Sequence, residues 1–565
     1  MGYMEKYNEW LNSPYFDEKT KQELLSIKDN DKEIEDRFYR ELEFGTAGLR
    51  GIVEAGTNRM NEYVVRKASY GLAKYFSKHY SDAKNRGIVI AHDNRNMSRE
   101  FCMVAAQTIA ATGLKVYYFD DLRTTPMLSF SVRNLNCVGG IVITASHNPP
   151  KYNGYKVYGE NGAQVMPDVA KAILNEIDNI NDFSEIPKYE EKNCSDLMVL
   201  LGSDIDDKFL EAVKANIIRD DVINQFSSDF KVIYTPLCGT GRVPVLRVLK
   251  DCGFENAFVV PEEEMPDPNF AGIKTPNPEE SVALARGIEL LKEKDADILI
   301  ATDPDCDRVG VAVKNSAGEI ELLTGNQIGG LLTEYIISGL KEKNRLPENA
   351  CMIKTVVTSE FGADIAKSFD VDVVSILTGF KFMGEKITQY EKDNSKSFIM
   401  GYEESYGYLV GTQCRDKDGV VATLLISEMA LYYRSKGQTL YEALLSLYEK
   451  YGYYREKTIS IMLEGKEGGE KIARIMTHLR NSNLKEISNK KVVELLDFEK
   501  GVEGFTKSNV LKYVLEDGSW VALRPSGTEP KIKVYIGTKD SVDDMAIEKV
   551  SEIEEYFLRE INAVN

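Results

Sequence analysis

Residues 139–149 read Gly-Gly-Ile-Val-Ile-Thr-Ala-Ser-His-Asn-Pro, and this stretch decides how the chain is interpreted. The apolar residues 141–143 are typical of a buried strand, and the small residues after them predict a turn with Ser146 at its tip. Asn148-Pro149 blocks an immediate helix, because proline lacks an N–H and holds the preceding residue extended. A hydroxyl in this position can face a cleft and accept a transferred group, although most serines in such loops only bond their own loop.

A second segment, residues 297–313, reads Asp-Ile-Leu-Ile-Ala-Thr-Asp-Pro-Asp-Cys-Asp-Arg-Val-Gly-Val-Ala-Val. It places Asp303, Asp305 and Asp307 at alternate positions after an apolar strand. Alternate side chains of an extended chain share one face, so three carboxylates can converge on one hard cation. An EF-hand is excluded, because its sixth and twelfth positions require Gly and Glu and here are Arg and Lys. A solvated acidic turn is the other alternative, and the flanking apolar strands favour the metal site over it.

A third segment, residues 520–535, places Arg524-Pro-Ser526-Gly527-Thr528 between two apolar strands. A guanidinium, two hydroxyls and backbone N–H groups freed by glycine are suited to binding a phosphate. A Walker loop is excluded, because no Gly-Lys-Ser/Thr follows a glycine at the required spacing. For this segment alone, an ordinary hairpin turn with a nearby arginine stays an alternative.

Strand-like and helix-like segments alternate along the chain, which predicts α/β layers with mostly parallel sheets. The clearest segments are a strand at 87–91, a helix at 99–112, a strand at 115–119, a strand at 231–234 and a helix at 243–249. The turn Gly239-x-Gly241 does not predict a nicotinamide cofactor, since Pro244 stands where a dinucleotide fingerprint has its third glycine. Residues 188–203 are polar and irregular and are expected to be a linker, followed by a helix from Asp206.

Composition is that of a soluble globular protein of several domains: 565 residues, 43% hydrophobic and 28% charged. No apolar run has the length of a membrane span, and the first residues do not resemble a signal peptide. Eight scattered cysteines without a Cys-x-x-Cys pair favour free thiols and the cytoplasm. A net charge of −19 argues against nucleic acid or an anionic membrane as a partner, and the four histidines do not suggest a histidine-rich zinc site.

The motifs together resemble the α-D-phosphohexomutase superfamily of phosphoglucomutases and phosphomannomutases, in a form most similar to the longer phosphoglucomutases related to phosphopentomutases. The family's phosphoserine, metal and phosphate loops are intact at residues 144–149, 303–308 and 524–530. Its sugar loop appears as Gly-Tyr-Glu-Glu-Ser-Tyr-Gly at 401–407, and its N-terminal signature as Phe-Gly-Thr-Ala-Gly-Leu-Arg-Gly at 44–51. The five motifs stand in the family's order.

The resemblance implies an α/β fold of four domains around a central cleft. Three related α/β units with mixed, mostly parallel sheets would be followed by a smaller α+β C-terminal domain. The expected boundaries are residues 1–205 with the phosphoserine loop, 206–315 with the metal loop, 316–455 with the sugar loop and 456–565 with the phosphate loop. A hairpin turn at 315–318 would close the second unit. The amphipathic first 40 residues are expected to pack as helices on the first domain.

The resemblance also implies a phosphoglucomutase activity that interconverts glucose 1-phosphate and glucose 6-phosphate. Ser146 would carry the phosphate between turnovers, with bound glucose 1,6-bisphosphate as intermediate and activator. Phosphoserine beside three aspartates needs a cation between them, so Mg²⁺ would be held by Ser146, Asp303, Asp305 and Asp307. The partner is a small sugar phosphate, and the enzyme would be a monomer or a homodimer.

The family's remaining roles carry over by position. Lys156 is the general acid/base candidate, with a pKa expected to be lowered by nearby cations, and Arg308 can reach the transferring phosphoryl oxygens. His147 is expected to orient the loop, and Arg50 belongs to the catalytic set as part of the signature. The residues expected to contact the substrate are Thr46, Thr378, Gly379, Glu403, Ser405, Lys417, Arg524, Ser526, Gly527 and Thr528. Plain surface roles for Lys156 and Lys417 are the alternatives.

Three departures and several alternatives accompany this interpretation. Tyr406 stands where some phosphomannomutases continue with Gly-His. Tyr402 stands where the commonest sugar loop has Gly, and Cys306 stands where the metal loop usually has Gly. A serine hydrolase is disfavoured, because there is no Gly-x-Ser-x-Gly elbow and His147 is badly placed for a triad. Four other functions stay possible alternatives: a phosphomannomutase or phosphopentomutase, a sugar-phosphate phosphatase, a non-catalytic binding protein, and an enzyme that makes hexose bisphosphate.

Overall fold

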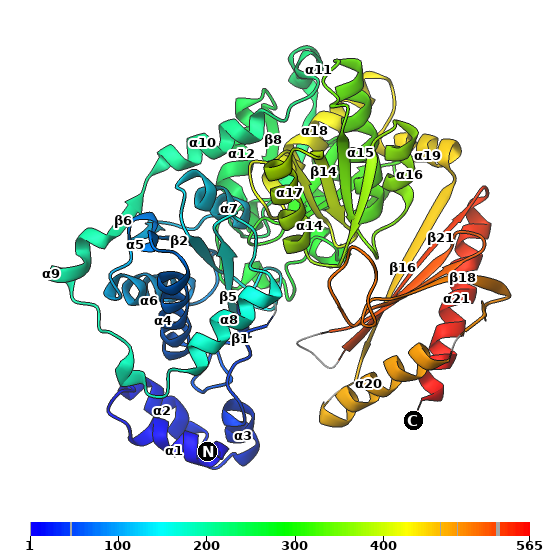
Figure 1. The fold of residues 1–565 in the computed structure, drawn as a ribbon. Coiled ribbons are helices and arrows are strands. Elements are labelled where there is room, and N and C mark those ends of the chain that lie inside the picture. Colours follow the sequence, from blue (N-terminus) through cyan, green and yellow to red (C-terminus); the bar gives the residue numbers. More distant parts are fainter. Residues whose placement is uncertain (1, 46–47, 464, 483, 527–530, 565) are drawn as a thin grey trace.

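The computed structural model describes residues 2–45, 48–463, 465–482, 484–526 and 531–564. Four sheets follow one another along the chain, each with its own covering helices (Figure 1). The first, second and third units are grouped together, and the C-terminal unit extends away from the third (Figure 1). The four-domain α/β architecture expected from the sequence is confirmed.

The first unit is a six-stranded sheet with helices on both faces. Its strands are β1 (Gly48–Ile52), β2 (Ile88–His92), β3 (Val116–Phe119), β4 (Gly139–Ile143), β5 (Tyr152–Gly159) and β6 (Met198–Leu201). Its helices are α4 (Glu62–His79), α5 (Ala83–Arg86), α6 (Ser98–Ala111), α7 (Thr125–Asn134), α8 (Pro167–Asp178) and α9 (Glu191–Cys194). Every residue of β2 and β4 is buried, which explains why these central strands are unbroken apolar runs.

The second and third units have five and four strands. The second contains β7 (Lys231–Thr235), β8 (Asn256–Val259), β9 (Ile298–Thr302), β10 (Val309–Lys314) and β11 (Ile320–Leu323), with α10 (Ser203–Lys214), α11 (Asp220–Phe226), α12 (Arg242–Asp251), α13 (Pro261–Glu264) and α14 (Ser281–Lys294). The third contains β12 (Ala350–Thr355), β13 (Asp372–Ile376), β14 (Ser397–Glu403) and β15 (Gly407–Val410), with α15 (Gly325–Glu342), α16 (Phe361–Ser368), α17 (Phe380–Asp393), α18 (Gly419–Ser435) and α19 (Leu440–Tyr451).

The three units repeat one topology. In each, two strands pair in parallel, a third joins the first of them in parallel, and a fourth runs antiparallel beside the third: β2-β3-β4-β5, β7-β8-β9-β10 and β12-β13-β14-β15. The connection from the third to the fourth strand contains Ser146 in the first unit, the three aspartates in the second and Ser405 in the third. The functional loops are therefore equivalent positions of a repeated fold.

The C-terminal unit is an antiparallel sheet covered by two helices. Its order is β16 (Tyr453–Met462), β21 (Lys531–Asp540), β20 (Trp520–Pro525), β19 (Leu511–Leu515), β18 (Lys490–Asp497) and β17 (Glu486–Ile487), and its helices are α20 (Gly465–Asn481) and α21 (Asp543–Ala563). Apolar side chains of Val356, Val357 and Leu377 in the third unit form one cluster with Trp520 and Tyr535 of this sheet. This cluster attaches the C-terminal unit to the third.

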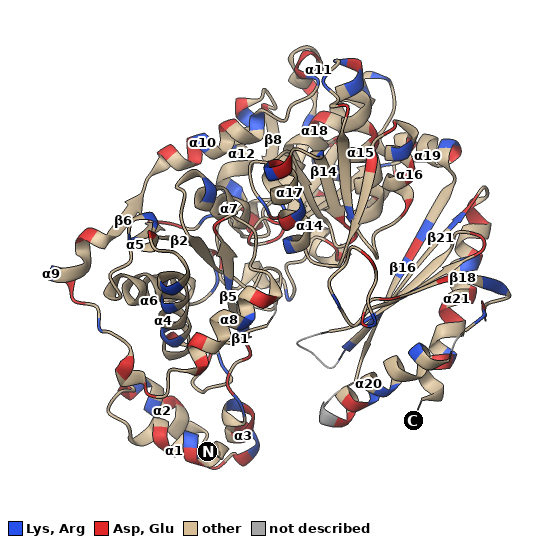
Figure 2. Ribbon diagram, in the orientation of Figure 1, with Lys and Arg blue, Asp and Glu red and all other residues tan. Residues whose placement is uncertain are grey.

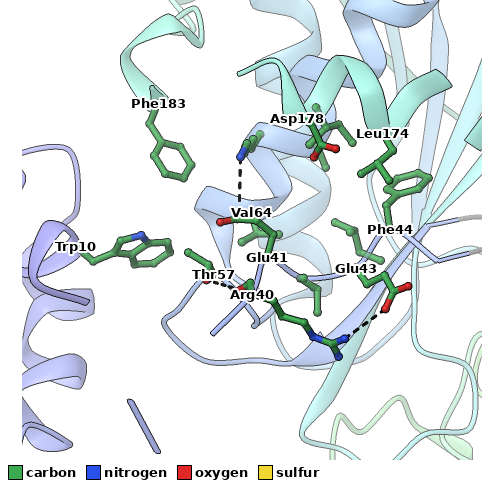
Figure 3. Close-up of a pocket in the computed structure, with 15 residues that line it drawn as sticks. Trp10, Arg40, Glu41, Glu43, Phe44, Thr57, Val64, Leu174, Asp178 and Phe183 are labelled. Atoms are coloured by element: carbon green, nitrogen blue, oxygen red, sulfur yellow. Dashed lines mark hydrogen bonds and ion pairs between the residues drawn. The ribbon is translucent and has the colours of Figure 1, made fainter. Parts of the chain in front are cut away.

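The N-terminal residues form three helices, α1 (Tyr3–Asn12), α2 (Glu18–Ser26) and α3 (Asp31–Phe38), which pack on the first unit as expected. Trp10 is the centre of an aromatic cluster with Phe16, Phe38, Tyr63 and Phe183. Beside it lies a cavity of about 310 Å³ whose lining includes Phe44 and Leu49 of the N-terminal signature (Figure 3). The cations on its wall, Lys67 and Arg40, are already paired with Glu41 and Glu43.

One expectation about the chain's organisation is wrong: residues 198–201 of the expected linker are strand β6, which pairs in parallel with β3. The predicted hairpin turn at 315–318 forms and joins β10 to β11, so the second sheet extends to Leu323. Acidic and basic residues are interspersed on outer helices such as α10 (Figure 2). Within the described ranges, no helix is both long and apolar enough to cross a membrane.

Candidate active site

Ser146 projects from the β4–β5 loop toward the second unit. Its backbone has the left-handed φ of +52°, and its N–H donates to Thr144 Oγ1 at 2.9 Å, which fixes the turn. The hydroxyl Oγ donates to Asp303 Oδ2 at 2.6 Å. The side chains are 157 residues apart in sequence, so this contact joins the phosphoserine loop to the metal loop.

The three aspartates expected to bind a metal do converge. One carboxylate oxygen of each of Asp303, Asp305 and Asp307 lies within 4.8 Å of the others, and all three residues are buried. Asp303 Oδ1 accepts the N–H groups of Asp307 and Arg308 at 3.0 Å, which curls the loop around this carboxylate. Cys306 at the tip has the left-handed φ of +57°, which explains why glycine is common there.

The donor set fits a hard divalent cation. Among the described residues, Asp305 Oδ1 and Asp307 Oδ1 are buried and lack any hydrogen-bond partner. Burial together with the charges of Asp305 and Asp307 raises the pKa of Asp303 far above its usual range. Buried carboxylates are stable in this arrangement only when cations compensate them, and all-oxygen coordination is what Mg²⁺ prefers.

Two lysines approach the carboxylates from different units. Lys156 on β5 places Nζ 2.7 Å from Asp305 Oδ2 and 3.6 Å from Asp307 Oδ2. Lys417, which precedes α18, places Nζ 3.1 Å from Asp307 Oδ2 and 3.2 Å from Asp416 Oδ1. Neither is a plain surface lysine, because their side chains are 13% and 11% exposed.

The expected lowering of the Lys156 pKa is wrong. Burial acts to lower this pKa, but Asp305 and Asp307 outweigh burial and the repulsion of Lys417, so the pKa lies above its ordinary value. The same balance raises the pKa of Lys417, with Asp307 and Asp416 outweighing burial. Both side chains are therefore ammonium groups at neutral pH.

His147 lies closer to the nucleophile than expected. Its Nδ1 is 3.2 Å from Ser146 Oγ, because the left-handed turn at Ser146 brings the neighbouring ring beside the hydroxyl. Burial and the charges of Arg308 and Arg50 hold its pKa well below the usual range, so the imidazole is neutral. Among the described residues no carboxylate bonds this ring, so the third member of a hydrolase triad is missing.

The two arginines assigned to catalysis contact different loops of the site. Arg308 Nη1 donates to Glu279 Oε1 at 2.5 Å, and its Nε is 4.0 Å from Asp307 Oδ1. Arg50 on β1 is exposed, and its Nη1 donates to Asn148 Oδ1 at 3.2 Å. Arg308 thus stands beside the carboxylates, while Arg50 contacts the loop that carries Ser146.

The sugar loop abuts the metal loop. Tyr406 O accepts the N–H of Val309, the residue after Arg308. Buried Glu403 accepts the Gly379 N–H at 2.9 Å, which brings two predicted sugar-binding positions together. Thr378 Oγ1 is buried without a hydrogen-bond partner among the described residues, and Ser405 is half-buried in the loop.

The phosphate loop is described in part. Arg524 lies at the end of β20, and the Ser526 N–H donates to Lys531 O at 2.7 Å. Thr46, Gly527 and Thr528, predicted to contact the substrate, lie outside the described residues. Arg524 is near enough to the third unit that burial and its charge lower the pKa of Lys381 to about 8.

Three residues of the site were not predicted from the sequence. Glu279 pairs with Arg308, and Thr125 at the start of α7 donates to Asp305 Oδ2 at 2.9 Å. Arg95 binds the backbone of the Ser146 loop. An Asp-Asn-Arg turn after a buried strand is a weak signal for Arg95, and Thr-Thr-Pro before a helix is a signal for a cap rather than for a site.

Comparisons with known proteins agree with this geometry. Residues 41–183, 207–318 and 324–451 match phosphoglucomutase/phosphomannomutase alpha/beta/alpha domains I, II and III, and residues 479–550 match the C-terminal domain of the same proteins. The phosphoglucomutase of Staphylococcus haemolyticus is 37% identical over 518 residues, covering 89% of this chain and 91% of that protein. That of Staphylococcus aureus strain MRSA252 is 37% identical over 531 residues, covering 92% and 93%.

Solved structures show the same fold. The pp63/parafusin phosphoglucomutase of Paramecium, in an open form, aligns with a TM-score of 0.70 at 18% identity over 93% of this chain and 95% of that one. A putative phosphomannomutase of Thermus thermophilus aligns with a TM-score of 0.68 at 20% identity over 93% and 100%. With all four domains matched in order and relatives at 37% identity along most of its length, the chain belongs to the phosphoglucomutase/phosphomannomutase family.

Proposed function

We propose that this protein is a phosphoglucomutase that interconverts glucose 1-phosphate and glucose 6-phosphate through a phosphoserine at Ser146. The observation that carries the proposal is the 2.6 Å contact of Ser146 Oγ with Asp303, at the edge of three converging carboxylates. Relatives at 37% identity named phosphoglucomutase support glucose as the sugar.

The proposed reaction moves one phosphoryl group at a time. The bond between phosphorus and Ser146 Oγ breaks, a bond forms between phosphorus and a free hydroxyl oxygen of the bound sugar monophosphate, and the proton of that hydroxyl passes, with Lys156 as acid and base, to Ser146 Oγ. The resulting glucose 1,6-bisphosphate turns around in the site, and its other phosphate returns to Ser146 by the reverse step. In-line transfer of this kind depends on positioning and on compensation of charge.

Ser146, Asp303, Asp305 and Asp307 would hold Mg²⁺. When bound, the ion compensates the charge of phosphoserine and polarises the phosphoryl group for transfer. The buried, unpartnered oxygens of Asp305 and Asp307 support this assignment.

Lys156 is the proposed general acid/base. Its ammonium group is held by Asp305 within the carboxylate cluster, and from β5 it can give a proton to one oxygen of the transfer and take one from the other. Lys417 and Arg308 supply fixed positive charge beside Asp307. His147 orients the hydroxyl of Ser146, and Arg50 holds the β4–β5 loop through its hydrogen bond to Asn148.

The third and fourth units are proposed to hold the substrate. Glu403 and Ser405 would bond the C3 and C4 hydroxyls, with Thr378 and Gly379 beside them. Arg524, Ser526, Gly527 and Thr528 would bind the phosphate that is not transferred, and Thr46 would face it from the signature. This division requires contact between the two units, which the pKa effect of Arg524 on Lys381 supports.

The location of the protein in the cell, its partner and its oligomeric state are also proposals. Eight free cysteines, seven of them buried, support a cytoplasmic protein that works without disulfides. Its partner would be the sugar phosphate rather than nucleic acid or membrane, and it would act as a monomer or a homodimer.

The test is the initial rate on glucose 1-phosphate, mannose 1-phosphate and ribose 1-phosphate, followed by ³¹P NMR with Mg²⁺ and a trace of glucose 1,6-bisphosphate. Glucose preferred at least tenfold, about 1.4 kcal/mol of transition-state discrimination, supports the proposal. A faster rate on mannose or ribose would keep the mechanism and change the sugar. Accumulating inorganic phosphate would show a phosphatase, and no turnover of any substrate would leave a binding protein.

A further inference from the structure

Arg95 is a fully buried arginine whose charged group binds the backbone of the phosphoserine loop. It lies between β2 and α6, and its side chain is 0% exposed. Nη2 donates to Ser146 O and to Asn148 O, both at 2.5 Å. Nη1 donates to Pro149 O and Tyr152 O, both at 3.1 Å. Three of the four acceptors lie in the connection between β4 and β5, and the fourth, Tyr152 O, belongs to the first residue of β5, so one guanidinium binds the loop from Ser146 to its end.

The guanidinium contacts Asp93 of its own unit and Phe270 of the second unit. Asp93 Oδ2 lies 3.4 Å from Nε, and Asp93 Oδ1 accepts the Arg95 N–H at 2.9 Å and the Ser98 hydroxyl at 2.6 Å. The ring of Phe270, from the second unit, lies 4.8 Å from the guanidinium carbon. A neighbouring side chain, Asn94, donates to Asp267 O in the same segment of the second unit at 2.8 Å. The orientation of Arg95 is therefore fixed by the first unit, which carries Ser146, and by the second unit, which carries the metal loop.

The loop needs such a device because its conformation is costly. The left-handed region is unfavourable for a residue other than glycine, and Ser146 has φ of +52°. The carbonyl groups of Ser146 and Asn148 accept from Arg95, and a buried carbonyl without a donor is unfavourable. Arg95 supplies four donors in a rigid, planar fork, which the single ammonium of lysine cannot reproduce.

We propose that Arg95 is a positioning residue of the transfer reaction, which holds the Ser146 loop in the left-handed turn that aims Oγ at Asp303. This inference rests on the proposed function. Arg95 does not contact substrate in this assignment, and it acts through the loop backbone. Because Phe270 and Asp267 belong to the second unit, the same residue keeps the loop in register with the metal loop.

The test compares Arg95→Lys with Arg219→Lys. Arg219 is a matched control, since it is 2% exposed, lies between the rings of Tyr335 and Tyr432 and donates to Tyr335 O, outside the site. Both variants are expected to lose stability. Only Arg95→Lys is expected to lose kcat, by about 100-fold, as misplacement of a reacting group by about 1 Å does, with KM changed less than threefold. Equal kcat losses in the two variants, or a kcat within twofold of wild type in Arg95→Lys, would overturn the proposal.

Two further measurements keep the proposal falsifiable. If Arg95→Lys does not fold, Asp93→Asn removes the charge that holds Nε while leaving an oxygen for the Arg95 N–H, and its kcat is expected to fall about tenfold at nearly constant KM; an unchanged kcat counts against the proposal. A crystal structure of either variant reports on positioning without any activity. Ser146 Oγ displaced from Asp303 supports the role, and an unmoved Ser146 refutes it. Failure of the proposed function would appear elsewhere, as absent turnover in the wild-type protein.

Discussion

At the scale of single residues, the site is a balance of buried charge. Ser146 contacts one of three converging carboxylates, two ammonium groups contact the other two, and two carboxylate oxygens still lack partners among the described residues. A phosphate on Ser146 would add nearly two negative charges to this set. The proposed Mg²⁺ would compensate this charge, and the next prediction tests where it binds.

Asp305→Asn should impair metal use more than substrate binding. The substitution removes an oxygen ligand and the partner of Lys156 while keeping the volume of the side chain. We expect kcat to fall at least about 100-fold and the Mg²⁺ concentration for half-maximal rate to rise at least tenfold, with KM for glucose 1-phosphate changed only a few-fold. Initial rates over a Mg²⁺ titration measure this, with exposed Asp196→Asn as the control. An unchanged Mg²⁺ requirement would refute the metal assignment.

Glu404→Gln should change how stability depends on pH. Burial, and next the charge of Glu403, raise the pKa of Glu404 from 4.5 to about 7. Between these values the unfolded chain releases the proton and the folded protein keeps it, so wild-type stability falls as pH rises from about 4.5 to 7. Glutamine carries no charge and avoids this loss, which amounts to about 3 kcal/mol at most.

Urea unfolding at pH 5 and pH 8 measures the effect. The free energy of unfolding of Glu404→Gln relative to wild type should be larger at pH 8 than at pH 5. Glu348→Gln on the surface is the control for the loss of one negative charge. A constant difference between Glu404→Gln and wild type at both pH values would show that Glu404 is ionised throughout.

The sequence predicts functional residues where those residues lie together in one short motif. Ser146, the three aspartates and Glu403 were found because each stands in a compact motif, and the structure brings Ser146 and the aspartates together. Arg95, Thr125 and Glu279 were missed because their partners are 29 to 180 residues away in sequence. The direction of the Lys156 pKa was wrong for a related reason: it depends on distances to two carboxylates that no motif specifies.

At the scale of elements, the sequence predicts the buried central strands but not the edge strands. β2 and β9 are buried throughout and begin with four apolar residues each, because helices cover both faces of their sheets. β6 and β11 lie at sheet edges, are only four residues long and are partly exposed, so neither stands out from the polar residues around it. The repeated position of the three functional loops follows from topology, which pairs strands that are distant in sequence.

Trp10→Ala should destabilise the first unit. Trp10 on α1 is 2% exposed and stacks on Phe16 at 4.2 Å between ring centroids. Removing a buried tryptophan leaves a cavity and typically costs about 3–5 kcal/mol. Urea unfolding should show this loss, while Leu25→Ala on α2, where the side chain is 50% exposed, should cost less than about 1 kcal/mol. Similar losses in the two variants would mean that the N-terminal helices do not stabilise the unit.

At the scale of the whole molecule, the second and third units share one hydrophobic core. α18 is buried along most of its length and contacts α11 and α12 on one side and β15 and α19 on the other. The first unit and the C-terminal unit have cores of their own. The four domains are therefore expected to behave as three cooperative units.

Leu425→Ala on α18 tests this coupling. Leu425 is 0% exposed, and its loss should cost about 2–5 kcal/mol. Native-state hydrogen exchange should show faster exchange in β9 and in β14 together, with β2 and β20 unchanged. Leu445→Ala on α19, where the side chain is 37% exposed, serves as the control. Faster exchange in only one of the two sheets would show that the shared core does not unfold as a unit.

The central claim is that Ser146 carries the phosphate in transit. The most direct measurement is incubation of the protein with ³²P-labelled glucose 1,6-bisphosphate, followed by peptide mapping and a chase with unlabelled glucose 1-phosphate. We predict label on Ser146 that moves into glucose phosphates during the chase, and no label on a folded Ser146→Ala variant. Label elsewhere than Ser146, a variant that keeps substantial mutase turnover, or label released as inorganic phosphate would contradict the account.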